Sequence, residues 1–295
     1  MDSLTLESAT SSRAVIPARR RLRSRFFRHP GARIGGLLIF LAVGGALLAP
    51  LLTTFNPIAV APVDRLQGPS GTHLLGTDIY GRDTLARVLY GGRISLAVGI
   101  LSVGLAVLLG GTVGALSGFW GGWADAAVMR VADVLLAFPA ILLAIGLLAF
   151  LGGGFWNVVL AIAIVYTAPL SRVARAAVLS VRHEEYIDAA RAIGLGDGRI
   201  LARHIMPNAV APLIVECTLR LALAILAEAA LSFLGLGTQP PAPTWGQMIA
   251  EGRAVMTFTA WPAIGPGLAI IITVLGFNLF GDAVRDVLDP HAVGA

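Results

Sequence analysis

The sequence predicts an all-α polytopic membrane protein with six transmembrane helices. Of its 295 residues, 56% are hydrophobic and only 13% are charged, so little polar surface is available to cover a soluble globule. The apolar residues gather in blocks near the roughly 20 residues that a helix needs to cross a bilayer. Backbone groups in lipid must form hydrogen bonds within their own segment, and helices are therefore the expected form of these blocks.

Six segments meet the length and composition of a transmembrane helix: 34–54, 94–116, 128–150, 155–173, 210–236 and 261–280. The first is too long for the core of a cleaved signal peptide, so we expect an uncleaved anchor helix. The other five spans form a core at 94–281.

Two patterns inside the spans concern packing. Gly110, Gly114 and Gly118 recur every four residues, which predicts a ridge of small residues that lets helices approach closely. Pro139 and Pro169 are expected to kink the third and fourth spans.

Positive charge predicts the orientation, and arginine supplies all 22 Lys+Arg residues. Most arginines lie before the first span or between the fourth and fifth spans. The positive-inside rule therefore places the tails 1–33 and 282–295 and the segment 184–208 in the cytoplasm.

The loops on the other side are expected to contain one helix. Within the external loop 55–93, Thr77 or Asp78 can cap a helix, and Leu85, Val88 and Leu89 form an apolar stripe at helical spacing. We expect this amphipathic helix to lie along the outer membrane surface, either as a docking platform or packed on the spans. In the proline-rich loop at 237–246, Trp245 suits the membrane interface.

The segment 184–208 is a polar insert between two apolar spans and contains EYIDAARAIGLGDGRILARHIMPN. Glu185, Asp188 and Arg191 fall at helical spacing, and Gly194 then breaks the helix. A second helical piece leads to Pro207, which suits the first turn of the next span. The segment therefore predicts a short rigid helix that a partner can grip.

Three charged residues lie within the fifth predicted span. Glu216 and Arg220 are four residues apart and can pair on one helix face, and Glu228 lies farther along. Charges in lipid are costly and indicate a pathway or an internal ion pair.

The remaining reactive residues predict neither a metal site nor catalysis. Cys217 is the single cysteine, and the five histidines lack metal-ligand spacing. With no lysine, the chain cannot form a Walker A phosphate loop, so ATP must bind to another subunit if ATP drives transport.

The insert resembles the "EAA" loop of permease subunits of bacterial ABC importers. The match rests on Asp188-Ala189-Ala190, Gly194 and Met206-Pro207. Asp188 replaces the usual glutamate of that pattern, and His204 and Met206 replace its isoleucine and leucine. Further strings resemble, in order, the C-type permease of the dipeptide/oligopeptide (peptide/nickel) branch: 75–78 (LGTD), 81–83 (GRD), 90–96 (YGGRISL), 231–237 (LSFLGLG) and 281–290 (GDAVRDVLDP).

This resemblance implies a type I ABC importer fold and half of a translocation pathway for di- or oligopeptides in the bacterial inner membrane. The implied partners are a second, B-type permease, two ATP-binding subunits that hold ATP and Mg, and an external solute-binding protein. The implied ATPase-coupling residues are Glu185, Tyr186, Asp188, Ala189, Ala190, Arg191, Gly194, His204 and Pro207. The residues of the external loop that could dock the binding protein are Gly76, Thr77, Asp78, Gly81, Arg82 and Asp83.

Two alternatives stay open at this point. The same architecture could import nickel, glutathione or another small solute. A stand-alone secondary transporter is the alternative from another class, although the internal inverted repeat that it would favour is not visible. Nucleic-acid binding, a cofactor held by this chain and enzymatic activity are not expected.

Overall fold

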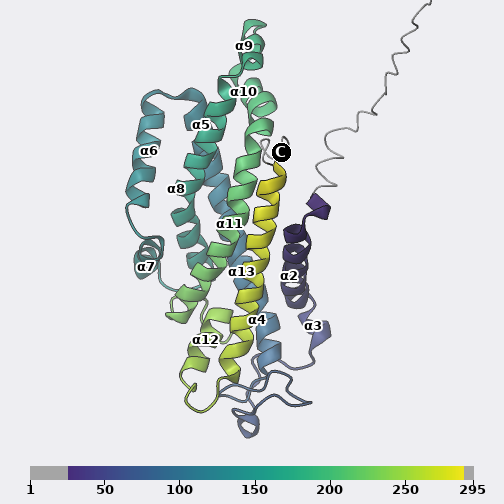
Figure 1. Cartoon of the computed structure of the whole chain (residues 1–295). Helices are drawn as coiled ribbons and strands as arrows, with labels where there is room; N and C mark the ends of the chain where they lie inside the picture. The colour runs from purple at the N-terminus through teal and green to yellow at the C-terminus, as the bar shows by residue number, and fades with distance from the viewer. Residues whose placement is uncertain (1–25, 289–295) are drawn as a thin grey trace, which may run out of the picture.

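A computed structural model describes residues 26–288, and these residues are predominantly helical (Figure 1). Five stretches are long and apolar enough to span a membrane: α2 (Pro30–Leu47), the run Thr84–Trp120, α8 (Phe155–Arg182), the run Asp197–Phe233 and α13 (Trp261–Leu288). The bent pair α6 (Gly122–Leu136) and α7 (Ala140–Leu151) gives a sixth if it counts as one span. The predicted all-α membrane fold is confirmed.

Both long runs contain a π-helical segment. The first joins α4 (Thr84–Ala106) to α5 (Thr112–Trp120) through Val107–Gly111. The second joins α10 (Asp197–Ile200) to α11 (Met206–Phe233) through Leu201–Ile205. The shorter elements are α3 (Ala49–Leu52), a 3-10 turn at Pro62–Asp64, α9 (Glu185–Ala192) and α12 (Trp245–Arg253).

The long helices lie side by side, with α9 at one end of the bundle and α12 toward the other (Figure 1). Helix α11 packs against both α8 and α13, and α2 packs along α13 at the edge of the bundle. The largest apolar cluster joins α4, α8 and α11, where Val98, Ile162, Leu170 and Leu231 are almost completely buried. Helices α8 and α11 therefore lie next to each other and extend from the α9 end of the bundle toward the α12 end.

The predicted glycine ridge is the contact between the run Thr84–Trp120 and α8. A Cβ atom on Gly110 would collide with the carbonyl oxygen of Thr167, and one on Gly114 with that of Ser171. At Gly118 the added atom would lie 2.9 Å from the Arg175 carbonyl oxygen. The two backbones approach this closely because none of the three positions has a side chain.

The expectation of a separate amphipathic surface helix is wrong. Leu85, Val88 and Leu89 lie in the first turns of α4, which continues directly into the membrane-spanning run. The cap is also neither Thr77 nor Asp78, because Asp83 Oδ1 accepts a hydrogen bond from the Ala86 N–H at 2.7 Å. This cap starts α4 ten residues before the predicted span.

The third span is a bent pair of helices, with 93° between α6 and α7. Pro139 immediately precedes α7, at the break, and extended backbone is typical of this cap position. Pro169 differs, because α8 runs unbroken through it. The kink predicted at Pro139 is therefore confirmed as a break between α6 and α7, whereas helix α8 continues through Pro169.

The interfacial position expected for Trp245 is also wrong. Trp245 opens α12 and is only 2% exposed. Its Nε1–H donates to the Val88 carbonyl at 2.9 Å, and its backbone N–H donates to Ser95 Oγ at 3.2 Å. The indole therefore fastens α12 onto α4, an interaction that satisfies its donor without water.

Candidate functional site

Helix α9 forms a projecting hairpin with the start of the run that contains α11 (Figure 1). Glu185 and Asp188 lie in its first turn and Arg191 in its last, a distribution that suits the helix dipole. Gly194 then adopts φ +82°, and its N–H donates to the Arg191 carbonyl at 2.9 Å. The left-handed glycine ends the helix and turns the chain toward α10.

Apolar side chains fix the hairpin to the bundle. Ile187, Ile200 and Ile205 are each 0% exposed. They join a cluster that includes Phe119 of α5 and Val178 of α8. The hairpin is therefore joined to α8 and α11 by close-packed side chains.

A second side of α9 is exposed and partly apolar. Tyr186, Ala189 and Ile193 follow one another at i, i+3 and i+7, so they share a face. Tyr186 is 44% exposed and Ile193 is 78% exposed. Asp188 and Arg191, elsewhere on the exposed surface of α9, form a pair at 3.2 Å. A projecting helix with an exposed apolar strip and an exposed ion pair is a suitable surface for a groove on a partner.

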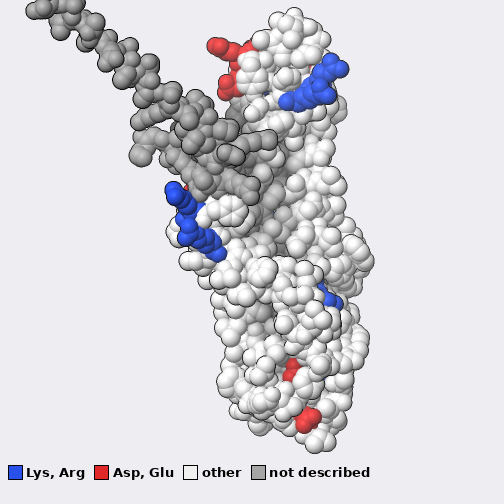
Figure 2. All heavy atoms as spheres, turned by 90° about the vertical axis from the view of Figure 1, so that its right-hand side faces the viewer, with Lys and Arg blue, Asp and Glu red and all other residues white. Residues whose placement is uncertain are grey.

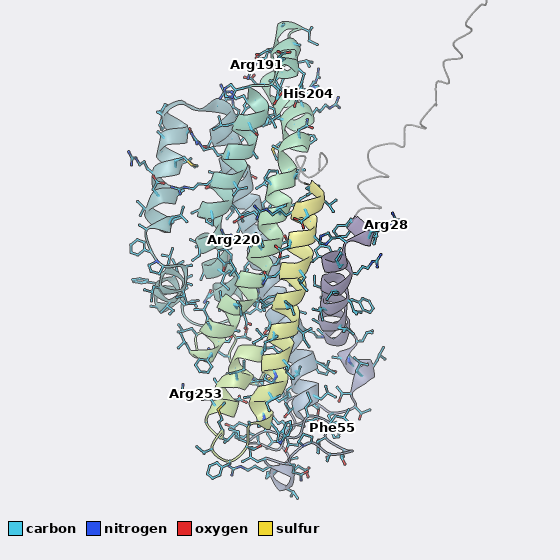
Figure 3. All side chains as sticks on the ribbon, viewed as in Figure 1. Arg28, Phe55, Arg191, His204, Arg220 and Arg253 are labelled. Carbon is cyan, nitrogen blue, oxygen red and sulfur yellow. The ribbon has the colours of Figure 1, made fainter. Side chains whose placement is uncertain are left out.

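The nine predicted coupling residues differ in their exposure. Ala190 is buried and anchors the helix, so it offers no side chain to a partner. Exposed positions are Glu185, Tyr186, Asp188, Ala189, Arg191, Gly194 and Pro207, and His204 is half-buried. Figure 3 shows Arg191 and His204 at the projecting end. Asn208 ties this end together, because its Nδ2 donates to the His204 carbonyl at 2.7 Å and to the Tyr186 hydroxyl at 3.3 Å.

Of the three charged residues predicted within the fifth span, Glu216 and Arg220 form an ion pair, and Glu228 lies apart from them. Arg220 Nη2 lies 2.5 Å from Glu216 Oε1, and the guanidinium stands over the Tyr166 ring at 5.4 Å. Glu228 is almost fully buried and accepts a hydrogen bond from Ser232 Oγ at 2.6 Å. The pairing that the spacing predicts is confirmed, while Glu228 takes no part in it.

Sequence reasoning missed two further ion pairs, both of which join α8 to α6. Arg172 of α8 pairs with Asp133 of α6. Arg175 makes a two-pronged contact with Asp125, with both N···O distances at 2.6 Å. Both pairs join residues about 40 to 50 positions apart, so no local spacing could have indicated them.

The six residues predicted to dock a binding protein do not form an exposed surface. Gly76, Thr77, Asp78, Gly81, Arg82 and Asp83 are all buried. Arg82 Nε lies 2.6 Å from Asp78 Oδ2, and Arg82 Nη2 lies 2.8 Å from Glu251 Oε2 of α12. His73 Nδ1 is 2.9 Å from Asp83 Oδ2. These side chains hold the loop together and fasten it to α12.

No group of three or more His, Cys, Asp or Glu side chains within residues 26–288 is arranged to hold a metal ion.

Comparison with known proteins identifies the family. Residues 110–293 match the family described as binding-protein-dependent transport system inner membrane component. Residues 18–69 match the N-terminal TM domain of oligopeptide transport permease C.

Three relatives are similar over most of their length. The dipeptide transport system permease protein DppC of Alkalihalophilus pseudofirmus is 46% identical over 88% of this chain and 85% of its own length. A putative peptide transport system permease protein of Brucella suis is 45% identical over 98% and 96%. The glutathione transport system permease protein GsiD of Pectobacterium atrosepticum is 46% identical over 90% and 89%.

A solved structure shares the fold. The MetNI methionine ABC transporter, in an inward-facing conformation, aligns with a TM-score of 0.57 at 20% identity, covering 69% of this chain and 97% of that chain. Together with the helical architecture, this confirms the type I ABC importer permease fold. The chain belongs to the family of binding-protein-dependent transport system inner membrane components, as a multi-pass permease of the C type.

Proposed function

We propose that this chain is one of two permease subunits in an ATP-driven importer of peptides, and that α9 docks on an ATP-binding subunit in the cytoplasm. The observation that carries the proposal is the exposed face Tyr186, Ala189 and Ile193 on a helix whose other face is locked to the bundle. Full burial of one side chain the size of isoleucine contributes about 1.5–3 kcal/mol. Ile193 is thus a suitable anchor for the groove of a partner.

Coupling follows from the hairpin geometry. When ATP closes the ATP-binding subunits, α9 moves with them, and the buried Ile187, Ile200 and Ile205 pass this motion to α8 and α11. The permease then switches between inward-facing and outward-facing states. The pair Asp188–Arg191 fixes the orientation of α9 in the partner's groove.

Nucleotide binding is assigned to the partner subunits. The chain contains no lysine, which the P-loop places on the nucleotide phosphates. We therefore propose that ATP and Mg are held by two ATP-binding subunits, with a second, B-type permease beside this chain and an external binding protein that delivers the cargo.

Peptide cargo is supported by the relatives named for dipeptide and peptide transport. A second candidate is glutathione, which is favoured by the permease GsiD at equal identity. Uptake of labelled dialanine and of labelled glutathione is measured separately with the same reconstituted transporter. Only the true cargo should accumulate in an ATP-dependent way.

The coupling role is tested by purifying the tagged chain from its host in mild detergent. In the wild type we expect the second permease and the ATP-binding subunits to co-purify. In the variants Asp188→Arg and Ile193→Asp, the amount of co-purifying ATP-binding subunit should fall about tenfold, while the amount of second permease should not change. The reason is that a charge reversed or buried at this contact costs about 1–3 kcal/mol of binding free energy.

The matched control is Ile58→Asp, an exposed isoleucine near the opposite end of the bundle, which should keep every partner. A wild-type chain that purifies alone contradicts the importer. Ile193→Asp that retains the ATP-binding subunits contradicts the role of α9.

A further inference from the structure

Two pockets follow one another along the face that α8 and α11 share. The pocket nearer α9 has a volume of about 470 Å³ and is lined by Val173 of α8, Pro212 and Glu216 of α11 and Arg285 of α13, among others. The second has a volume of about 240 Å³ and lies between α7, α8 and α11, with Tyr166 in its lining.

The pair Glu216–Arg220 lies between these two pockets. Glu216 lines the first pocket and Tyr166 lines the second. Arg220 contacts both of them, Glu216 through an ion pair at 2.5 Å and Tyr166 through its ring at 5.4 Å. Figure 3 shows Arg220 about midway along the bundle. A polar bridge therefore connects one pocket to the next, partway along a membrane-spanning helix.

The charges on this face argue against contact with lipid. The side chains of Arg220 and Glu216 are 24% and 19% exposed. Ionised groups that face acyl chains are costly, so such groups face protein or a water-filled cavity.

The side of the bundle that carries α2 has a different character. Its exposed residues include Ile34, Leu37, Phe40 and Leu41. Figure 2 views this side; where grey atoms do not cover it, the surface between the two ends is mostly white, with blue patches beside the grey atoms and lower down. That surface suits acyl chains, whereas the charged pair on the α8–α11 face requires protein or water beside it.

We infer that the α8–α11 face lines the translocation pathway and that Glu216 and Arg220 form a contact site on it for solutes carrying both an ammonium and a carboxylate group. Glu216 accepts through Oε1 from Nε and Nη2 of Arg220. This leaves Glu216 Oε2 for a solute ammonium and the Arg220 Nη1 donors for a solute carboxylate.

The closeness of the two charges explains why a dipolar solute is favoured. An ion of one sign is attracted by one member of the pair and repelled by the other, so its net gain is small. A solute with both charges gains from both members and leaves the pair intact after it passes. This site rests on the proposed function, because it requires that a solute crosses here.

Water access is tested by thiol labelling in the assembled transporter. The background is Cys217→Ala, which removes the single native thiol. Leu223→Cys lies on the same stripe of α11 as Arg220 and is 46% exposed, and Leu37→Cys on α2 is a matched control at 57%. We expect a charged, membrane-impermeant methanethiosulfonate to label position 223 at least about tenfold faster than position 37, because only the former meets water. Equally slow labelling overturns the inference.

Charge recognition is tested by uptake of labelled dialanine and of its C-terminal amide into proteoliposomes holding the whole transporter. Arg220→Gln should slow dialanine about tenfold, as expected for a lost charged contact, and its amide about twofold or less. Each rate is compared with wild type for the same solute, so selection by the binding protein cancels. Equal slowing of both solutes, or of neither, overturns the site.

The exchange Glu216→Arg with Arg220→Glu keeps both charges and should keep assembly and the preference for dialanine. If the exchange abolishes that preference while the transporter still assembles, the charges do not act as a pair. The two proposals fail separately. Absence of any ATP-driven uptake contradicts the proposed function. Normal uptake without labelling at position 223 contradicts only the inference that the α8–α11 face lines the translocation pathway.

Discussion

Arg87 shows how much of this chain's charge is held inside the fold rather than displayed. Its side chain is 1% exposed and lies between Asp78 and Glu251, with Nη1 2.7 Å from Glu251 Oε2. Arg82 contacts the same two carboxylates. Two guanidiniums and two carboxylates therefore neutralise one another and join the loop, α4 and α12. Removal of one member leaves buried charge without compensation.

Glu251→Ala tests this network. We expect a loss of stability of about 3–5 kcal/mol, because two buried guanidiniums lose an acceptor, and a clear fall in the melting temperature of the purified transporter. Asp286→Ala is the control, since its pair with His29 is exposed, with Asp286 at 62%, and is worth about 0–1 kcal/mol. Equal melting shifts would show that the network adds no more than a surface pair.

At the scale of elements, two contacts depend on glycine for different reasons. Gly114 has no room for a side chain because α5 lies against the α8 backbone. Gly194 has open space around it but adopts φ +82°. The first position therefore tests packing between helices, and the second tests the conformation that joins α9 to α10.

Gly114→Ala should destabilise the chain by about 1–3 kcal/mol, because the methyl group forces α5 and α8 apart. Gly104→Ala is the matched control in the same helical run, with nothing within 4 Å of the added atom, and should be neutral or slightly stabilising. Thermal unfolding of the purified transporter measures both. A neutral Gly114→Ala would contradict the close approach of the two helices.

Gly194→Ala should leave the bundle folded and weaken coupling. The left-handed conformation costs a residue with a Cβ atom about 1–2 kcal/mol, so the turn shifts and tilts α9. We expect uptake per ATP hydrolysed to fall severalfold in proteoliposomes. Gly198→Ala in α10 has equal space and no positive φ, and uptake per ATP should be unchanged; similar losses in both would exclude the turn as the cause.

For the whole molecule, the two ends differ in what they expose. The α9 end exposes an apolar strip and an ion pair, while the end near α12 holds its ion network inside. The two ends of the bundle are therefore different surfaces. We propose that the α9 end faces the cytoplasm.

Thiol labelling in whole cells tests this orientation on the Cys217→Ala background. Ala202→Cys, an exposed position beyond α10 at the hairpin end and off the proposed docking face, should react with an impermeant reagent only after permeabilisation. Val63→Cys at the opposite end, 93% exposed, should react in intact cells. The reverse pattern would invert the assignment of both ends.

The sequence predicted those features that are encoded locally. Helix α9, its glycine turn, the pair Glu216–Arg220 and the glycine ridge depend on spacings within one helix or turn. The 93° bend after α6 depends on the packing of α7 and was indicated only by Pro139. Helix α12 and the network around Arg87 depend on contacts between distant segments, which no single window contains.

The unbroken helical run Asp197–Phe233 also has a mechanical consequence. Its 37 residues correspond to a rod of about 55 Å at 1.5 Å per residue. A stiff rod of this length that pivots near one end converts a tilt of about 10° into a displacement of about 10 Å at the other. A small tilt of the run imposed at the hairpin would therefore move its far end by enough to open a passage for a small molecule.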